Sequence, residues 1–140
     1  MDTSSTPSKF PAFLPVLFTS LGLTLSGLVG LALVVLYTLP TLGPRWLFFF
    51  LFFITLTGLA LPIVYFLNRR FPSTPMPNST VLVRQALWVG IYGDVALWLQ
   101  MGHIFNLALA VFLAAGLIAI ELLLRMRERS LWKPEEAKNE

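Results

Sequence analysis

Four stretches of the chain are apolar enough to cross a lipid bilayer, which takes about 20 residues of α-helix. They run over residues 15–39, 46–67, 81–101 and 104–124. Together they occupy most of the chain and leave no room for a separate soluble domain. The pattern therefore predicts an all-α integral membrane protein that forms a single membrane domain over residues 1–140, with four transmembrane helices.

Turn-forming residues separate these stretches. The segment over residues 40–44 predicts a tight turn, and three prolines exclude a helix from a longer connector over residues 68–77. Only Gly102 and His103 separate the last two stretches. The expected architecture is therefore an up-down-up-down bundle made of two helical hairpins.

Positive charge is distributed unevenly between the two sides of such a bundle. Of the 10 Lys and Arg residues, all except Arg45 fall on the side that holds both termini and the connector. Cytoplasmic loops are enriched in Lys and Arg, so both termini are expected in the cytoplasm, with a bacterial cytoplasmic membrane as the expected location. We expect a mobile N-terminal tail over residues 1–9 and a basic tail over residues 125–140, which anionic lipid headgroups could also attract.

Composition excludes several classes of function. The 140-residue chain is 56% hydrophobic and 12% charged, whereas an ordinary soluble domain carries about 25% charged residues. This difference excludes a water-soluble enzyme. With no Cys and one His, the chain also offers no disulfide framework, thiol nucleophile or Cys-ligated metal. We therefore expect no catalytic site, metal or cofactor, and no nucleic-acid partner.

Small residues mark the expected contacts between helices. In lipid no hydrophobic force joins helices, so small side chains that let two backbones approach closely become the signal. The candidates are Gly22, Ser26 and Gly30 in the first stretch, Gly90 and Gly93 in the third, and Ala115 and Ala119 in the fourth. They predict packing within the bundle or the docking of another subunit.

Two charged residues in the last two stretches suggest an ion pair. Arg84 and Glu121 lie at equal depth on either side of the turn at Gly102 and His103. We expect them to form an interhelical ion pair near the cytoplasmic interface, with Arg125 competing for Glu121 through an i, i+4 contact. Such a pair fits either a structural pin or a gate or proton relay.

Asp94 is the strongest candidate for a functional side chain. It lies about 12 Å from the outer turn, at about 1.5 Å of helix per residue, and a charge near the centre of a span costs about 2.5–3.5 kcal/mol. Gln100 adds another polar group to the same stretch. The expected partners of the Asp94 carboxyl are Tyr37, Arg45, Asn106 or a group of another subunit. Asp94 is then either an ion-binding or proton-carrying group, or a hydrogen-bonding group that joins helices.

Three hypotheses of function fit these features. The first is a non-catalytic accessory, assembly or scaffold subunit of a larger membrane complex, whose partners are membrane lipids and other subunits or further copies of itself. The second is a small transporter or channel protomer that uses Asp94. The third is a subunit that helps to hold a pigment, haem or quinone, with His103 as one candidate contact, although His103 is expected to be a solvated turn residue.

The chain resembles the small multidrug exporters in size and in its number of spans. These exporters depend on one membrane carboxylate, which lies in their first span. Here the first stretch carries no charge, so no residue role is carried across.

Overall fold

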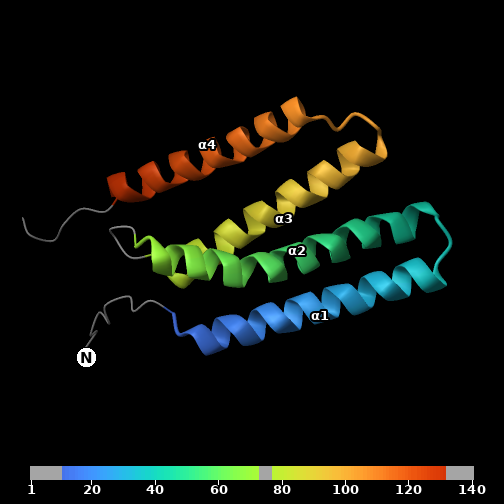
Figure 1. Cartoon of the computed structure of the whole chain (residues 1–140), viewed down its shortest axis with the longest axis horizontal. Helices are drawn as coiled ribbons and strands as arrows, with labels where there is room; N and C mark the ends of the chain where they lie inside the picture. The colour runs from blue at the N-terminus through green and yellow to red at the C-terminus, as the bar shows by residue number, and fades with distance from the viewer. Residues whose placement is uncertain (1–10, 73–76, 132–140) are drawn as a thin grey trace, which may run out of the picture. The chain divides into compact units, whose positions relative to one another are not determined.

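The computed structural model describes residues 11–72 and 77–131, which form four α-helices (Figure 1). In chain order these are α1 (Phe13–Tyr37), α2 (Leu42–Arg70), α3 (Ser79–Met101) and α4 (Leu107–Leu131). One compact unit extends to Trp98 and contains α1, α2 and most of α3, and a second unit begins at Leu99 and contains α4. The predicted all-α class with four helices is confirmed. The expected N-terminal tail and residues 132–140 of the expected C-terminal tail lie outside the described residues.

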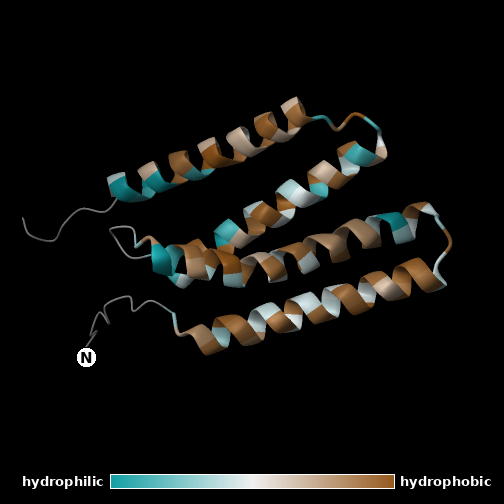
Figure 2. Cartoon of the chain, viewed as in Figure 1, coloured by the Kyte–Doolittle hydropathy of each residue, from teal (hydrophilic) through white to brown (hydrophobic). Residues whose placement is uncertain are grey.

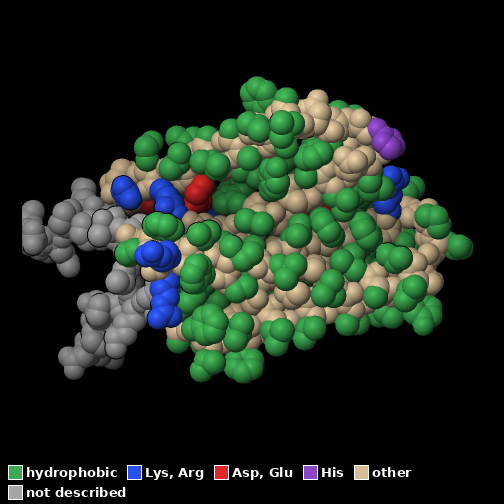
Figure 3. Space-filling view, viewed as in Figure 1, with side chains coloured by type: hydrophobic (Ala, Val, Ile, Leu, Met, Phe, Trp, Pro, Cys, Tyr) green, Lys and Arg blue, Asp and Glu red, His purple; other side chains and the backbone are tan. Residues whose placement is uncertain are grey.

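Three of the described helices, α1, α2 and α4, are long and apolar enough to cross a membrane, which indicates an integral membrane protein. Figure 2 shows apolar residues along most of α1 and α2, with hydrophilic residues at both ends of α2, and Figure 3 shows hydrophobic side chains spread over the visible surface. α3 has 23 residues, but its polar side chains, among them Arg84 and Asp94, lower its hydropathy. Length and composition thus support three of the four expected spans.

The ends of α2 differ from the expected boundaries because proline is compatible with a first helical turn. The turn expected over residues 40–44 is shorter, since α2 begins at Leu42 and includes Pro44. The first N–H groups of a helix have no intrahelical acceptor, so a proline there removes no hydrogen bond. α2 also continues to Arg70 rather than ending before residue 68, and the first proline after it is Pro72, which restricts only the residue directly before it.

α1 and α2 pack side by side through glycines that face threonines. Gly27 of α1 lies so close to Thr55 of α2 that a Cβ on the glycine would clash with the Thr55 side chain. Gly58 of α2 lies against Thr24 of α1, where an added Cβ would be 2.8 Å from the Thr24 backbone nitrogen. Each glycine therefore lets the two backbones approach at a point that a larger residue would hold apart.

The predicted small-residue stripe of α1 divides between two faces. Gly30 contacts α2, because a Cβ there would be 2.7 Å from a methyl carbon of Leu51. Gly22 has nothing within 4 Å of an added Cβ, and Ser26 is exposed. Gly27, which is not part of the predicted stripe, also contacts α2; it lies one residue from Ser26 and nearly a third of a turn around the helix.

A proline inside α2 creates a backbone acceptor that α1 satisfies. Pro62 has no N–H, so the carbonyl of Gly58, four residues earlier, loses its intrahelical donor. The buried hydroxyl of Ser20 in α1 donates to this carbonyl oxygen, with an Oγ to O distance of 2.7 Å. The hydrogen bond lies in the same glycine contact that brings the helices together, so α2 keeps its proline without leaving a buried acceptor unpaired.

A double-mutant cycle tests this coupling. Ser20→Ala is expected to lower the free energy of unfolding in detergent by about 0.5–2 kcal/mol, because it leaves the Gly58 carbonyl without a donor. In a Pro62→Ala background the helix supplies its own N–H to that carbonyl, so Ser20→Ala is expected to cost less. Equal costs in both backgrounds would show that Ser20 does not act through the carbonyl freed by Pro62.

Candidate functional site

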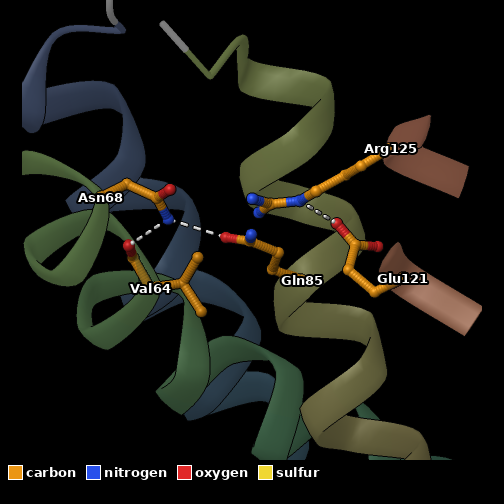
Figure 4. Close-up of polar contacts among 5 residues, drawn as sticks. All are labelled: Val64, Asn68, Gln85, Glu121 and Arg125. Carbon is orange, nitrogen blue, oxygen red and sulfur yellow. Dashed lines mark hydrogen bonds and ion pairs between the residues drawn. The ribbon is translucent and has the colours of Figure 1, made fainter. Parts of the chain in front are cut away.

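α2 and α3 are held together at one end by a pair of side-chain amides. The Nδ2 group of Asn68 donates to the carbonyl oxygen of Val64 in its own helix at 2.8 Å and to Oε1 of Gln85 in α3 at 2.7 Å (Figure 4). One amide NH₂ supplies two donors, so both bonds use the full donor capacity of Asn68. The sequence pattern placed Asn68 in a connector and did not predict this contact.

Further along the same two helices, α3 presents small residues to α2. Ala86 is completely buried, and a Cβ on Gly90 would clash with Thr57 and Phe53. A Cβ on Gly93 would clash with Leu56. Gly90 and Gly93 thus contact α2 through their bare backbone.

Asp94 follows Gly90 by one helical turn, on the edge of this α2-facing side of α3. The Cα–Cβ bonds of a helix tilt toward its N-terminus, which for Asp94 is the direction of Gly90. Its Oδ1 atom is buried and has no hydrogen-bond partner among the described residues. Asp94 is half-buried, and its Oδ1 is a buried polar atom that the described chain leaves unpaired.

The partners expected for Asp94 do not bond to its Oδ1 atom. Tyr37 is 81% exposed, and Arg45 is exposed near the beginning of α2. Asn106 precedes α4, and its Oδ1 accepts the backbone N–H of Leu109 at 2.9 Å. These three side chains thus have other surroundings or other bonds.

Thr57 carries a second buried oxygen of this kind, on α2. The residue is only 6% exposed, and its Oγ1 has no hydrogen-bond partner among the described residues. Thr55, which is 5% exposed, shows the usual alternative, because its Oγ1 donates to the carbonyl oxygen of Leu51 at 2.8 Å. Nothing in the sequence distinguishes Thr57 from Thr55, but in the structure Thr57 lies against Gly90 of α3 and Thr55 lies against Gly27 of α1.

Most of α1 and α2 offers no charged or titratable group to Thr57 or Asp94. Residues 13–36 of α1 and 46–64 of α2 include no Lys, Arg, His, Asp, Glu or Tyr. A buried polar group that has no partner costs about 1–3 kcal/mol. Thr57 and Asp94 carry two such oxygens near Gly90. We call the contact formed by Thr57, Gly90 and Asp94 the seam, and it is the candidate functional site.

The remaining polar candidates lie elsewhere. Within α4, Nε of Arg125 lies 3.0 Å from Oε1 of Glu121 in the expected i, i+4 contact (Figure 4). Arg84 and Glu121 belong to different units, and their ion pair stays a prediction. Gln100 is exposed. The small residues predicted for packing on α4, Ala115 and Ala119, are also exposed.

The backbone of His103 has a structural role at the end of α3. It follows α3 with a positive φ of 56°, the left-handed conformation that glycine usually provides at a helix end. Its N–H donates to the Gln100 carbonyl at 3.0 Å, and the N–H of Ile104 donates to the Leu99 carbonyl at 3.1 Å. These two bonds form a Schellman motif. Among residues 11–72 and 77–131, no three His, Asp or Glu side chains are placed to hold a metal ion.

Substitutions at His103 test this backbone role. His103→Gly is expected to keep or raise the thermal unfolding midpoint, because glycine adopts positive φ without steric cost. His103→Val is expected to lower the free energy of unfolding by about 1–2 kcal/mol, because a β-branched residue is strained in this conformation. A loss of stability in His103→Gly equal to that in His103→Val would contradict the assignment.

Comparison with known proteins found no match to this chain among protein-family models, curated proteins or solved structures. The function is therefore argued from the residues and their geometry.

Proposed function

We propose that this protein is a non-catalytic accessory, assembly or scaffold subunit of a larger membrane complex. In this proposal α3 is a fourth transmembrane helix and both termini are cytoplasmic. The observation that carries the proposal is a face of α1 that is made of small residues and is exposed in the part of the chain that the structure describes.

This face is defined by Thr19, Gly22 and Ser26, all of them exposed. Their spacing of three and four residues places them on one side of the helix, away from the α2 contact at Gly27. The hydroxyl of Thr19 donates to the Pro15 carbonyl at 2.9 Å, and that of Ser26 donates to the Leu23 carbonyl at 3.1 Å. Because the hydroxyls are satisfied and the side chains are short, another transmembrane helix can approach the α1 backbone here.

The contacts of α3 support its insertion as a helix that depends on its neighbours. A helix with Arg84, Gln85 and Asp94 inserts poorly alone, and such residues face protein rather than lipid. Gln85 bonds to Asn68 of α2, and the glycines of α3 lie directly on α2. The excess of Lys and Arg on the side of the termini supports the proposed orientation.

Co-purification tests the proposal on the protein in its native membrane. A tagged chain is extracted in mild detergent, and the accompanying chains are quantified by mass spectrometry. We expect unrelated membrane proteins in fixed stoichiometry. Gly22→Leu is expected to reduce their recovery by about tenfold or more, which corresponds to about 1.4 kcal/mol of binding free energy. The new side chain enters open space, so the thermal unfolding midpoint should stay unchanged.

Leu28→Phe is the matched control, because Leu28 is 49% exposed and lies on a different side of α1. This variant is expected to recover the same partners as the unmodified chain. Recovery of the chain only with copies of itself, together with solute flux that Asp94→Asn abolishes, would favour a transporter or channel instead. A visible absorption band that follows the protein would favour a subunit that holds a pigment, haem or quinone.

A further inference from the structure

Two buried oxygen atoms without hydrogen-bond partners lie along one seam between two helices. The Thr57 hydroxyl lies directly against Gly90 of α3, whose missing side chain leaves room for it. Asp94 follows one turn later on α3, and the Cα–Cβ bonds of a helix tilt toward its N-terminus, which for Asp94 is the direction of Gly90. Oγ1 of Thr57 and Oδ1 of Asp94 are the two buried side-chain atoms that have no partner in the part of the chain that the structure describes. Their coincidence at one glycine points to a shared ligand.

Local structure does not explain why either oxygen is unpaired. A buried helical threonine can donate to a carbonyl one turn earlier, as Thr55 does two residues away. The Thr57 hydroxyl does not use this bond. An ionised carboxylate accepts hydrogen bonds or a cation and donates nothing, so it needs a donor or a positive charge from outside the group.

We propose that Thr57 and Asp94 bind a small monovalent cation, Na⁺ or a hydrated proton, in the seam between α2 and α3. Hydroxyl and carboxylate oxygens are hard ligands, which prefer hard cations. Asp94 is the one acidic residue in α1, α2 and α3. A monovalent cation therefore leaves the seam neutral, whereas a divalent one leaves an uncompensated charge in an apolar environment.

This binding goes beyond the proposed accessory role and does not depend on it. Residues 13–36 of α1 and 46–64 of α2 contain no titratable side chain, and the nearest one on α3 is Tyr92, two residues before Asp94 and on a different side of the helix. A response of this unit to Na⁺ or pH that requires both Thr57 and Asp94 is thus attributable to the seam.

The test uses the purified full-length chain in lipid nanodiscs. Binding of ²²Na⁺ is measured directly, and the thermal unfolding midpoint is measured against NaCl with choline chloride at constant ionic strength, and separately against pH. Thr57→Val and Asp94→Asn are compared with Thr55→Val. This control removes a hydroxyl that is equally buried on the same helix but already bonded to its own backbone.

For a Na⁺ site, the unmodified chain and Thr55→Val are expected to bind ²²Na⁺ and to gain a higher midpoint as NaCl increases, because a ligand that binds the folded state stabilises it. Thr57→Val is expected to weaken the affinity about tenfold or more, and Asp94→Asn to abolish binding. For a proton, the midpoint depends on pH rather than on Na⁺, and the same two variants reduce and abolish that dependence.

Identical ion and pH profiles in the unmodified chain and Asp94→Asn would overturn the proposal. So would a dependence that Asp94→Asn removes but that is the same in Thr57→Val and Thr55→Val, because Asp94 would then titrate alone. No partner protein takes part in the test, so its failure and the failure of the accessory role are distinguishable.

Discussion

The unit that contains α1 and α2 depends on one constraint, which is that a polar backbone group away from water must find a partner within the protein. Pro62 removes a donor from the middle of α2 and exposes the Gly58 carbonyl. Ser20 of α1 donates to that carbonyl at 2.7 Å. The hydrogen bond is possible because Gly58 carries no side chain and the two backbones lie close together there. A proline, a glycine and a serine therefore act together to join the two helices.

The same constraint applies where α2 contacts α3, and at one place in this contact it is not met. The Asn68 amide is satisfied by Val64 and Gln85, so this end of the contact has no unpaired donor. At Gly90 the helices again approach through a bare backbone, yet the oxygens of Thr57 and Asp94 have no partner among the described residues. Among the described residues of this unit the other buried side-chain oxygens and nitrogens have partners, and this contrast is the reason for proposing a site at Thr57 and Asp94.

The sequence alone predicts the helices well, because long apolar stretches and prolines are local signals. Pro62 lies four residues after Gly58 and so frees its carbonyl, but the donor comes from α1 and depends on the rotation of one helix against the other. That rotation also decides that Gly27, and not Gly22, lies against α2. Small residues occur on several sides of α1, so their spacing cannot select the face that packs.

The candidate site was predictable only in part for the same reason. Asp94 is evident in the sequence because a carboxyl is costly in an apolar helix. Thr57 is not evident, because threonine in a helix usually bonds to its own backbone and Thr55 has the same local sequence character. The two threonines differ in their neighbours, because Thr55 lies against Gly27 of α1 and Thr57 lies against Gly90 of α3. The pairing of Arg84 with Glu121 requires the arrangement of two separate units, which local patterns do not determine.

The central claim is that α3 crosses the membrane beside α2, with its polar side chains covered by protein. The chain has no cysteine, so single cysteines introduced by Leu42→Cys, Arg70→Cys, Val89→Cys and His103→Cys can each be labelled without background. A membrane-impermeant maleimide is expected to label positions 42 and 103 in intact cells. Position 70 is expected to be labelled only after the cells are permeabilised. Position 89 is expected to stay unlabelled in both conditions. Labelling of position 103 only after permeabilisation, or labelling of position 89 by the impermeant reagent, would contradict the account.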